Sequence, residues 1–360
     1  MSQEKPAKVS TFDEGVIFGQ MADSAFDFLD QAAADLEKKP KYAVIHFATA
    51  IELILKARLL REHWALVVTT SGEADRHAFQ GGSAKTVTVD QAIKRLEQIA
   101  DQHLPAGAPE AFKAISTHRN RMIHFFHEAT SREAEETARA KVTAELLLGW
   151  YYLLRMFRTW EAYFVEYQPR IQRVEWGMRR LRGYLQVVFD KLQPQLVELA
   201  AKGVTFHDCA SCGFLSARVA SIDDMIDDLS CGVCGLTDTL VTMPCPQEDC
   251  QGTLRLTGYN NADEACDTCN QQIEREHLVE FLDTEHSEYF EFTVKNCGLC
   301  TSPGSVVQHN KIYICTNCLT HDEQIPTCEW CNEMQLGYDL DFSYYKGCEF
   351  CDGKGGWDAD

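Results

Sequence analysis

Apolar residues recur at helical spacing along most of the first half of the chain. Residues 13–37 and 40–66 each carry them three and four positions apart, a period that predicts amphipathic helices. The second segment illustrates the pattern with Val44, Phe47, Ile51, Ile54 and Leu55. Pro40 stands where that segment begins, and proline is tolerated in the first turn of a helix. We therefore expect two long helices at the start of the fold.

The same period predicts further helices after a loop. Residues 67–88 are rich in Thr, Ser and Gly and predict the loop. Thr88 or Asp90 can cap a helix that runs to about residue 102. Pro109 then opens a helix that reaches about residue 129.

The broadest apolar stripe belongs to the next helix. Ser131 and the glutamates after it begin a segment that we expect to run through Phe164, and its stripe contains Leu146, Leu147, Trp150, Leu153 and Leu154. Pro169 should end or kink this helix, because proline cannot continue the hydrogen-bond ladder. A further helical segment extends to about residue 200. The first half therefore predicts an all-α bundle.

The second half has a different pattern. Short β-rich pieces such as 311–314 lead directly into pairs of cysteines, and Gly213 and Gly235 follow the second cysteine of their pairs. A residue without a β-carbon permits a tight turn there. The amphipathic stretch 273–292 predicts a helix or a hairpin between modules. We expect a multidomain protein in which an array of small β-rich modules follows the helical bundle.

Sixteen cysteines fall in eight close pairs, all after residue 208. Seven pairs have two residues between the cysteines and one has four. A turn of that length directs two thiolates to one point, and two such turns complete a tetrahedral zinc shell. Taken in chain order, the pairs make four sets: Cys209, Cys212, Cys231 and Cys234; Cys245, Cys250, Cys266 and Cys269; Cys297, Cys300, Cys315 and Cys318; Cys328, Cys331, Cys348 and Cys351.

These sets predict four structural zinc ions in zinc ribbons rather than a disulfide framework. Disulfides need an oxidising compartment, and the first residues show no apolar segment of a secretion signal. No apolar run is long enough to span a membrane. We therefore expect a cytoplasmic protein with reduced thiols. A zinc ion closed by four sulfurs has no open position for a substrate, so we expect no catalytic metal and place the candidate chemistry in the first half.

The charge lies almost entirely in the second half. The chain has a formal net charge of −20, and residues 201–360 carry 8 Lys and Arg against 28 Asp and Glu. Recognition of nucleic-acid phosphates depends on Lys and Arg. The acidic array is therefore predicted to contact a protein partner or trigger more readily than nucleic acid.

An Arg–polar–x–x–x–His sequence stands in the helix predicted at 109–129. Arg119 is followed by the polar Asn120, and His124 lies five positions after the arginine. An upstream helix holds Glu52 and Lys56 among aliphatic residues, and the long apolar helix follows the motif. This arrangement resembles HEPN domains, a helical family that includes many prokaryotic RNA-cutting toxins and defence nucleases. The resemblance covers roughly residues 13–168.

The resemblance implies a homodimer in which two motifs form one composite site. It also implies metal-independent cleavage of RNA to a 2′,3′-cyclic phosphate and a 5′-hydroxyl. The side chains suit this reaction, because Arg119 presents a planar fork of donors to a phosphate and His124 can exchange a proton near neutral pH. Asn120 can orient either group. Positions 119 and 124 lie about 140° apart around a helix, so one copy does not make a compact site.

A structural interpretation of the same residues stays open. Arg119 and Arg121 can form ion pairs with acidic neighbours, His124 can be a satisfied core histidine, and some HEPN domains are inactive scaffolds. His118 and His127 flank the motif, either as supporting groups or as solvated side chains. An intrahelical pair is the default for Glu52 and Lys56, which are one turn apart.

A basic cluster follows the helical domain. It contains five arginines, interleaved with Trp176 and Tyr184: Arg170, Arg173, Arg179, Arg180 and Arg182. They can form a solvated helix face, contact RNA beside the nuclease site, or dock the acidic ribbons of the same chain.

The expected organisation is a HEPN-like domain over residues 1–168, a helical connector over 169–204 and four ribbons over 205–360. The ribbons cover approximately 205–240, 241–275, 293–323 and 324–360. The expected function is that of a dimeric endoribonuclease, a toxin or antiphage (abortive-infection) effector, regulated by the ribbons and without a membrane partner. The alternative is a non-catalytic zinc-ribbon scaffold dimerised by an inactive HEPN bundle.

Overall fold

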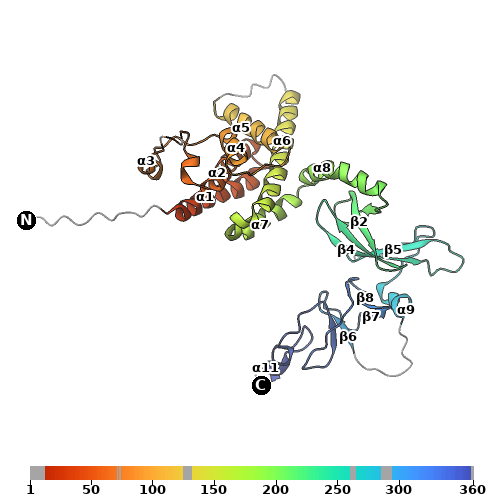
Figure 1. The fold of residues 1–360 in the computed structure, drawn as a ribbon. Helices are drawn as coiled ribbons and strands as arrows, with labels where there is room; N and C mark the ends of the chain where they lie inside the picture. Colours follow the sequence, from red (N-terminus) through yellow and green to blue (C-terminus); the bar gives the residue numbers. More distant parts are fainter. Residues whose placement is uncertain are drawn as a thin grey trace, which may run out of the picture. The chain divides into compact units, whose positions relative to one another are not determined.

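The chain folds into two units, Met1–Asp190 and Lys191–Asp360. The computed structural model describes residues 13–70, 72, 74–124, 132–259, 265–284 and 294–357. The first unit is helical and the second is rich in β-strands (Figure 1), as the two apolar periods predict. The division between them falls inside the last long helix, so the first unit extends beyond residue 168, where the sequence placed the end of the helical domain.

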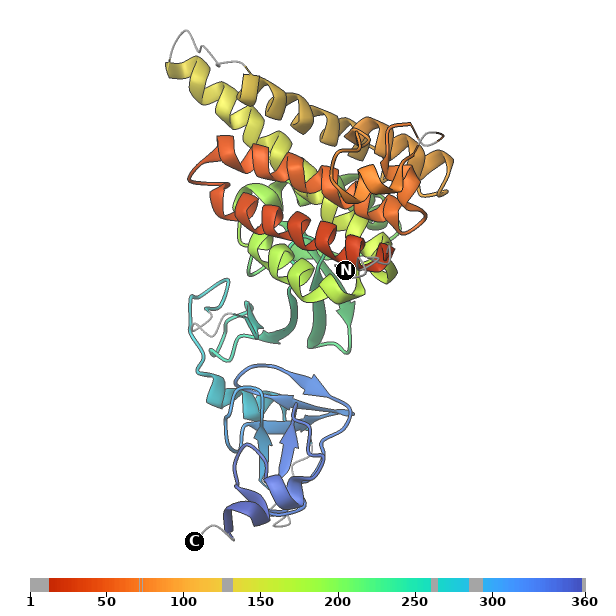
Figure 2. The same cartoon turned by 90° about the vertical axis from the view of Figure 1, so that its left-hand side faces the viewer.

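Helices alone build the described part of the first unit. The two N-terminal helices lie side by side (Figure 2). The elements are α1 (Glu14–Asp35), α2 (Pro40–Leu60), η1 (Trp64–Val67), α3 (Arg76–Gln80), α4 (Val89–Gln98), α5 (Ala108–His124), α6 (Arg132–Thr159), η3 (Glu161–Tyr163), η4 (Val165–Tyr167), α7 (Gln168–Arg179) and α8 (Arg182–Ala201).

Helix starts follow the local signals in the sequence. The Thr88 hydroxyl accepts the N–H of Gln91, and the Gln91 side chain accepts the N–H of Thr88, which closes a capping box on α4. Asp13 caps α1 through the N–H groups of Gly15 and Val16. Pro40 lies in the first turn of α2. These side chains satisfy or remove donors that a first turn leaves unpaired.

Several helix ends differ from the sequence prediction. α2 ends at Leu60, before a 3₁₀ turn, and α3 lies inside the segment predicted as a loop. Asp75 explains α3, because its carboxylate accepts the N–H groups of His77 and Ala78. α6 ends at Thr159 rather than Phe164, so Pro169 opens α7 instead of ending α6.

The core of the first unit is aromatic and brings three helices together at the candidate site. Phe47 on α2 stacks on Trp150 on α6, with ring centroids 4.4 Å apart. Gly149 makes this approach possible: a β-carbon there would lie 2.3 Å from Ile115 Cδ1 and 2.8 Å from Phe47 Cε1. α7 also belongs to this core through Ile171, Val174 and Met178. The packing therefore fixes α5 against α2 and α6.

The second unit is built on three small sheets. A five-stranded antiparallel sheet contains β1 (Phe206–Asp208), β2 (Leu215–Ser221), β3 (Ile226–Cys231), β4 (Thr237–Pro244) and β5 (Thr253–Thr257) in chain order. β7 (Val306–His309), β8 (Ile312–Cys315) and β9 (His321–Asp322) form a second antiparallel sheet, and β6 (Lys295–Cys297) pairs in parallel with β10 (Met334–Leu336). The short helices are η5 (Arg275–His277), α9 (Leu278–Leu282), α10 (Ser343–Lys346) and α11 (Gly353–Trp357).

The first three ribbons share a core rather than standing as separate modules. Val241 and Leu254 of the five-stranded sheet, Leu282 of α9 and Ile314 of β8 belong to one buried cluster. Polar links reinforce it: the Arg275 guanidinium donates to the carbonyls of Thr257 and Asn317, at 2.6 and 2.7 Å. Of the stretch 273–292, residues 285–292 lie outside the described part, and α9 supplies its helix.

Within the described residues, no helix combines the length and the apolar character needed to cross a bilayer.

Candidate metal centres and candidate active site

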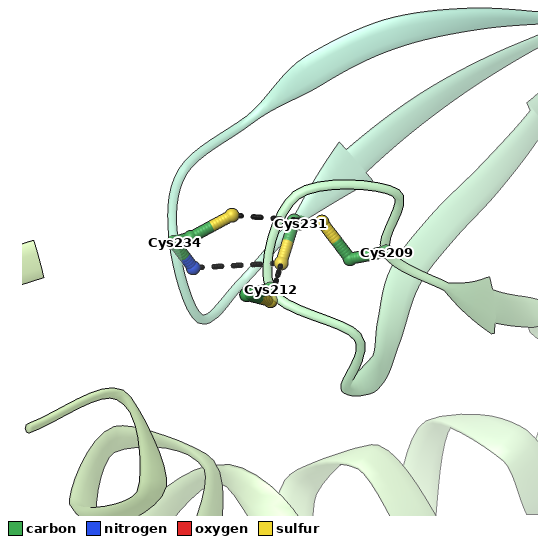
Figure 3. A group of neighbouring side chains, drawn as sticks. All are labelled: Cys209, Cys212, Cys231 and Cys234. Atoms are coloured by element: carbon green, nitrogen blue, oxygen red, sulfur yellow. Dashed lines mark hydrogen bonds between the residues drawn. The ribbon is translucent and has the colours of Figure 1, made fainter. Parts of the chain in front are cut away.

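The sixteen cysteines form four clusters, each made of two consecutive pairs as the sequence predicts. Within a cluster all Sγ atoms lie within 4.8 Å of one another. In the first cluster, one pair comes from the turn between β1 and β2 and the other from the turn between β3 and β4, and the four side chains converge (Figure 3). The members are those of the four sets predicted from Cys209 to Cys351.

The sulfur positions fit a tetrahedral metal shell. A Zn–S bond of about 2.3 Å places the four sulfurs about 3.8 Å apart. The Sγ–Sγ distances are 3.5 Å for Cys209–Cys234 and 3.8 Å for Cys328–Cys351. A disulfide would hold two sulfurs about 2.05 Å apart, and all sixteen cysteines are free thiols. The clusters can therefore each hold a metal ion, and their arrangement is consistent with zinc ribbons.

A left-handed turn builds most of the cysteine pairs. The residue after the second cysteine has a positive φ in six of the eight pairs: Gly213, Gly235, Asn270, Thr301, Leu319 and Asn332. In five of these, its N–H donates to the carbonyl of the first cysteine at 2.8–3.1 Å, Thr301 being the exception. Glycine and asparagine favour this conformation, so the sequence signals four of the six turns. Buried Leu319 carries no such signal.

Local hydrogen bonds also lower the pKa of some of the thiols, which favours the thiolate form. The backbone N–H groups of Cys269 and Thr268 lower the pKa of Cys266 to about 7. Burial raises the pKa of Cys231, but the Ser216 hydroxyl and nearby N–H groups outweigh it and lower that pKa to about 7. A thiolate is the form that binds metal. Because four sulfurs close each shell, these centres can hold structure but offer no position for a substrate.

The candidate active site lies on α5, facing α2. Residues of α5, α2, the first turn of α4 and the segment before it line a cleft of about 430 Å³, which includes Glu52, Thr86, Asp90, Lys113, Ser116, Arg119 and Asn120. Arg119 is about one-third exposed, Asn120 is exposed, and Lys113 brings a second cation to the cleft. Lys113, Ser116 and Asn120 recur at helical spacing, a signal that could have identified the first two from the sequence.

Glu52, which lines this cleft, contacts two cations, Lys56 and Arg119. Its Oε1 lies 2.5 Å from Lys56 Nζ, which confirms the intrahelical pair, and its Oε2 lies 3.8 Å from Arg119 Nη1. Lys56 also donates to the Thr86 hydroxyl at 3.0 Å. Sequence reasoning missed Thr86, because a loop residue thirty positions away carries no local sign of this contact. Arg119 Nε has no hydrogen-bond partner among the described residues.

The histidines near the motif have different surroundings. His124 is the last residue of α5, and its side chain lies outside the described residues, as does the whole of His127. His118 is largely buried, and its Nε2 pairs with Glu145 of α6. His118 therefore links α5 to α6 and does not lie free in solvent.

The basic cluster is only partly available to a partner. Arg170 donates to Asp27 at 2.9 Å and to Asp30 at 2.5 Å, which holds α7 on α1. Arg179 donates to Glu175 at 2.8 Å. Burial raises the pKa of Glu175, but Arg179 and Arg158 outweigh that effect and lower it. The other three arginines, Arg173, Arg180 and Arg182, have exposed side chains.

Comparisons with known proteins add no identification. No protein family, curated protein or solved structure matches this chain. The interpretation of the site therefore rests on its own residues.

Proposed function

We propose that the protein is a metal-independent endoribonuclease of HEPN type that acts as a homodimer. Arg119, Asn120 and His124 of two protomers would form the composite site. The phosphate would lie against the guanidinium, and the histidines would take the proton of a ribose 2′-hydroxyl and give one to the leaving 5′-oxygen. The products would be a 2′,3′-cyclic phosphate and a 5′-hydroxyl.

The observation that carries this proposal is the position of Arg119. It lines an open cleft beside Asn120 and Lys113, and its side chain is about one-third exposed. Its contact with Glu52 is long, at 3.8 Å. A purely structural arginine usually forms short, paired hydrogen bonds with a carboxylate. Arg119 therefore keeps donors that a phosphate could occupy.

The cysteine clusters would bind four structural zinc ions, and their acidic unit would regulate the nuclease in a cytoplasmic toxin or antiphage effector. The sulfur spacing supports the choice of zinc, because it matches the edge of a tetrahedral Zn–S₄ shell. The negative charge of residues 201–360 supports a regulatory contact with protein over one with RNA.

RNA cleavage in EDTA tests the activity. Arg119→Ala removes phosphate stabilisation and should lower the rate by ~10²–10³. His124→Ala removes proton transfer and should lower it by ~10²–10⁴. Exposed Arg139 and His103 provide matched alanine controls that should cut RNA normally. If the His124→Ala protein, prepared in parallel, cuts RNA as fast as the wild type, the assignment of His124 as a catalytic residue is wrong.

Two further measurements accompany this test. Zinc should be quantified after EDTA treatment, so that loss of the ribbons is not mistaken for a metal requirement. Light scattering should find a dimer for the wild type, because one motif does not complete the site. A monomer that cuts RNA would contradict the composite mechanism.

The alternative is a non-catalytic scaffold in which the HEPN-like bundle only dimerises. The Glu52–Arg119 contact favours it, because this pair gives Arg119 a structural partner. If Arg119→Ala lowers stability and no RNA is cut by the wild type, the scaffold replaces the nuclease.

A further inference from the structure

An aromatic patch lies on the fourth cysteine module and has no part in the proposed active site. It consists of Trp330, Phe342, Tyr344 and Tyr345. Phe342 is 69% exposed and Tyr345 is 61% exposed. Tyr344 packs edge-on against Trp330 and Tyr345, with centroid distances of 5.4 and 5.1 Å. Exposed aromatic surface of this kind is typical of an interaction site.

Phe342 and Tyr345 lie outside the buried part of the module. Its buried contacts include Leu336 and Ser343, whose hydroxyl accepts the N–H of Glu329 at 3.0 Å. The hydrophobic cluster that contains Leu336 includes none of the four aromatic residues. The cysteine cluster can close the module without them. Their size and exposure therefore call for a role outside folding.

The backbone of Phe342 strengthens this conclusion. Its φ is 63° and its ψ is 23°, a left-handed conformation that bulky residues rarely adopt. The N–H groups of Tyr345 and Lys346 donate to its carbonyl, so the turn is required to start α10. Asparagine or glycine would make the same turn with less strain. The chain instead keeps an exposed phenylalanine there, as strained residues at binding sites often do.

The surroundings of the patch favour a cationic partner. Residues 324–357 contain six acidic residues and two lysines. Both lysines lie near aromatic rings: Lys346 Nζ is 5.4 Å from the centroid of Phe342, and Lys354 Nζ is 5.9 Å from that of Tyr345. These contacts show that the rings are placed to accept cations. Phe342 and Tyr345 nevertheless keep most of their surface open.

We propose that the aromatic patch docks a basic segment of a partner protein. Arginine or lysine side chains of that segment would stack on Phe342 and Tyr345, and the net negative charge of the module would attract the remaining charge. Single-stranded RNA also stacks on aromatic rings, but its binding sites combine the rings with a positive groove. The net negative charge here disfavours phosphates. This docking surface does not depend on whether the first unit cuts RNA.

Peptide binding to the full chain tests the proposal. The protein should carry Arg119→Ala, so that nuclease activity cannot interfere. The probe is a short fluorescein-labelled arginine-rich peptide, compared by anisotropy with the same peptide carrying citrulline at every arginine. We expect the arginine peptide to bind more tightly, and Tyr345→Ala or Phe342→Asn to weaken it by ~10-fold. Tyr259→Ala, which removes an exposed tyrosine elsewhere in the second unit, should not weaken binding of the arginine peptide.

Folding and binding can be separated in this experiment. Asparagine tolerates the left-handed turn, so Phe342→Asn should keep its zinc and its unfolding temperature. If Phe342→Asn loses zinc, its affinity for the peptide is not interpreted. The affinity of Tyr345→Ala, provided that this variant retains zinc, then decides the result. The proposal is overturned if the citrulline peptide binds equally well, or if the patch variants bind the arginine peptide as Tyr259→Ala does.

Two other occupants have distinct signatures, and either would overturn the proposal. Labelled single-stranded RNA that loses affinity in the patch variants, while the peptide does not, would indicate base stacking. Self-association that is lost in the patch variants would indicate a second copy of the chain.

Discussion

Replacing Glu52 by alanine distinguishes the Glu52–Lys56 pair, which should stabilise the fold, from Arg119, which should be needed for activity more than for stability. Lys56 is only 7% exposed, and its ammonium contacts Glu52 at 2.5 Å and the Thr86 hydroxyl at 3.0 Å. Without Glu52, the Thr86 hydroxyl is the only one of these described contacts that the Lys56 ammonium keeps. A buried charge that loses its counter-ion is strongly destabilising.

The size of the effect follows from the burial of the two partners. Breaking a fully buried pair costs ~3–5 kcal/mol. Glu52 is 29% exposed, so water can partly replace it and we expect about 2 kcal/mol. For a unit of this size, that loss lowers the unfolding temperature by ~4–8 °C. Arg119→Ala should lose less than about 1 kcal/mol, because its contact with Glu52 is long and both side chains are partly exposed.

Thermal and chemical unfolding followed by the helical circular-dichroism signal measures these differences. The double variant Glu52→Ala/Lys56→Met removes the stranded charge and should regain most of the lost stability. Glu198→Ala is a matched control, because it breaks an exposed pair with Lys202 at the same spacing and should change little. The reasoning is refuted if Glu52→Ala is as stable as Arg119→Ala, or if the double variant is no more stable than Glu52→Ala.

Three further predictions concern the second unit. Elemental analysis should find about four zinc ions per chain, and replacing Cys315 and Cys318 together by serine should unfold their module while the helical signal persists; a ratio near two would contradict the four closed shells. Truncation after residue 204, or charge reversal at the exposed Arg180 and Arg182, should raise RNA cleavage if the acidic unit restrains the nuclease, and abolished cleavage would instead indicate recruitment. Burial raises the pKa of Asp223, but N–H groups of Met225 and Ile226, Asn310 and His309 outweigh it and lower that pKa. The contribution of the ionised Asp223 carboxylate to the free energy of unfolding is therefore present above the ordinary pKa of aspartate and lost as pH falls through the lower folded value. Asp223→Asn should flatten the acid side of the profile of that free energy against pH. An unchanged profile would show that the group is not linked to folding.

Local patterns explain what could be predicted from the sequence. Helical periodicity identified the long helices, and caps such as Thr88 located their starts. Cysteine spacing identified the four metal-binding sets, because each pair closes through a turn of a few residues. The intrahelical Glu52–Lys56 pair was likewise a matter of spacing. Each of these features depends on residues close together in the chain.

Features that join distant segments were not predictable in the same way. The contact between Lys56 and Thr86 requires the loop before α4 to return to α2. The continuous sheet from β1 to β5 merges two modules that spacing alone would separate. Leu319 adopts a left-handed turn although its side chain disfavours it, because burial in the shared core compensates for the strain. Tertiary packing decides such cases, and no local signal reports it.

Closure by metal also explains how a small module can display large aromatic side chains. A chain segment as short as 324–357 can bury little apolar surface, so ordinarily its tryptophan, tyrosines and phenylalanine would be needed for its core. Four sulfurs around one ion would supply the closure instead, because metal binding contributes directly to folding free energy. The rings would then be free to lie on the surface without unfolding the module. Exposed aromatic residues in an acidic four-cysteine module are for this reason better explained by recognition than by packing.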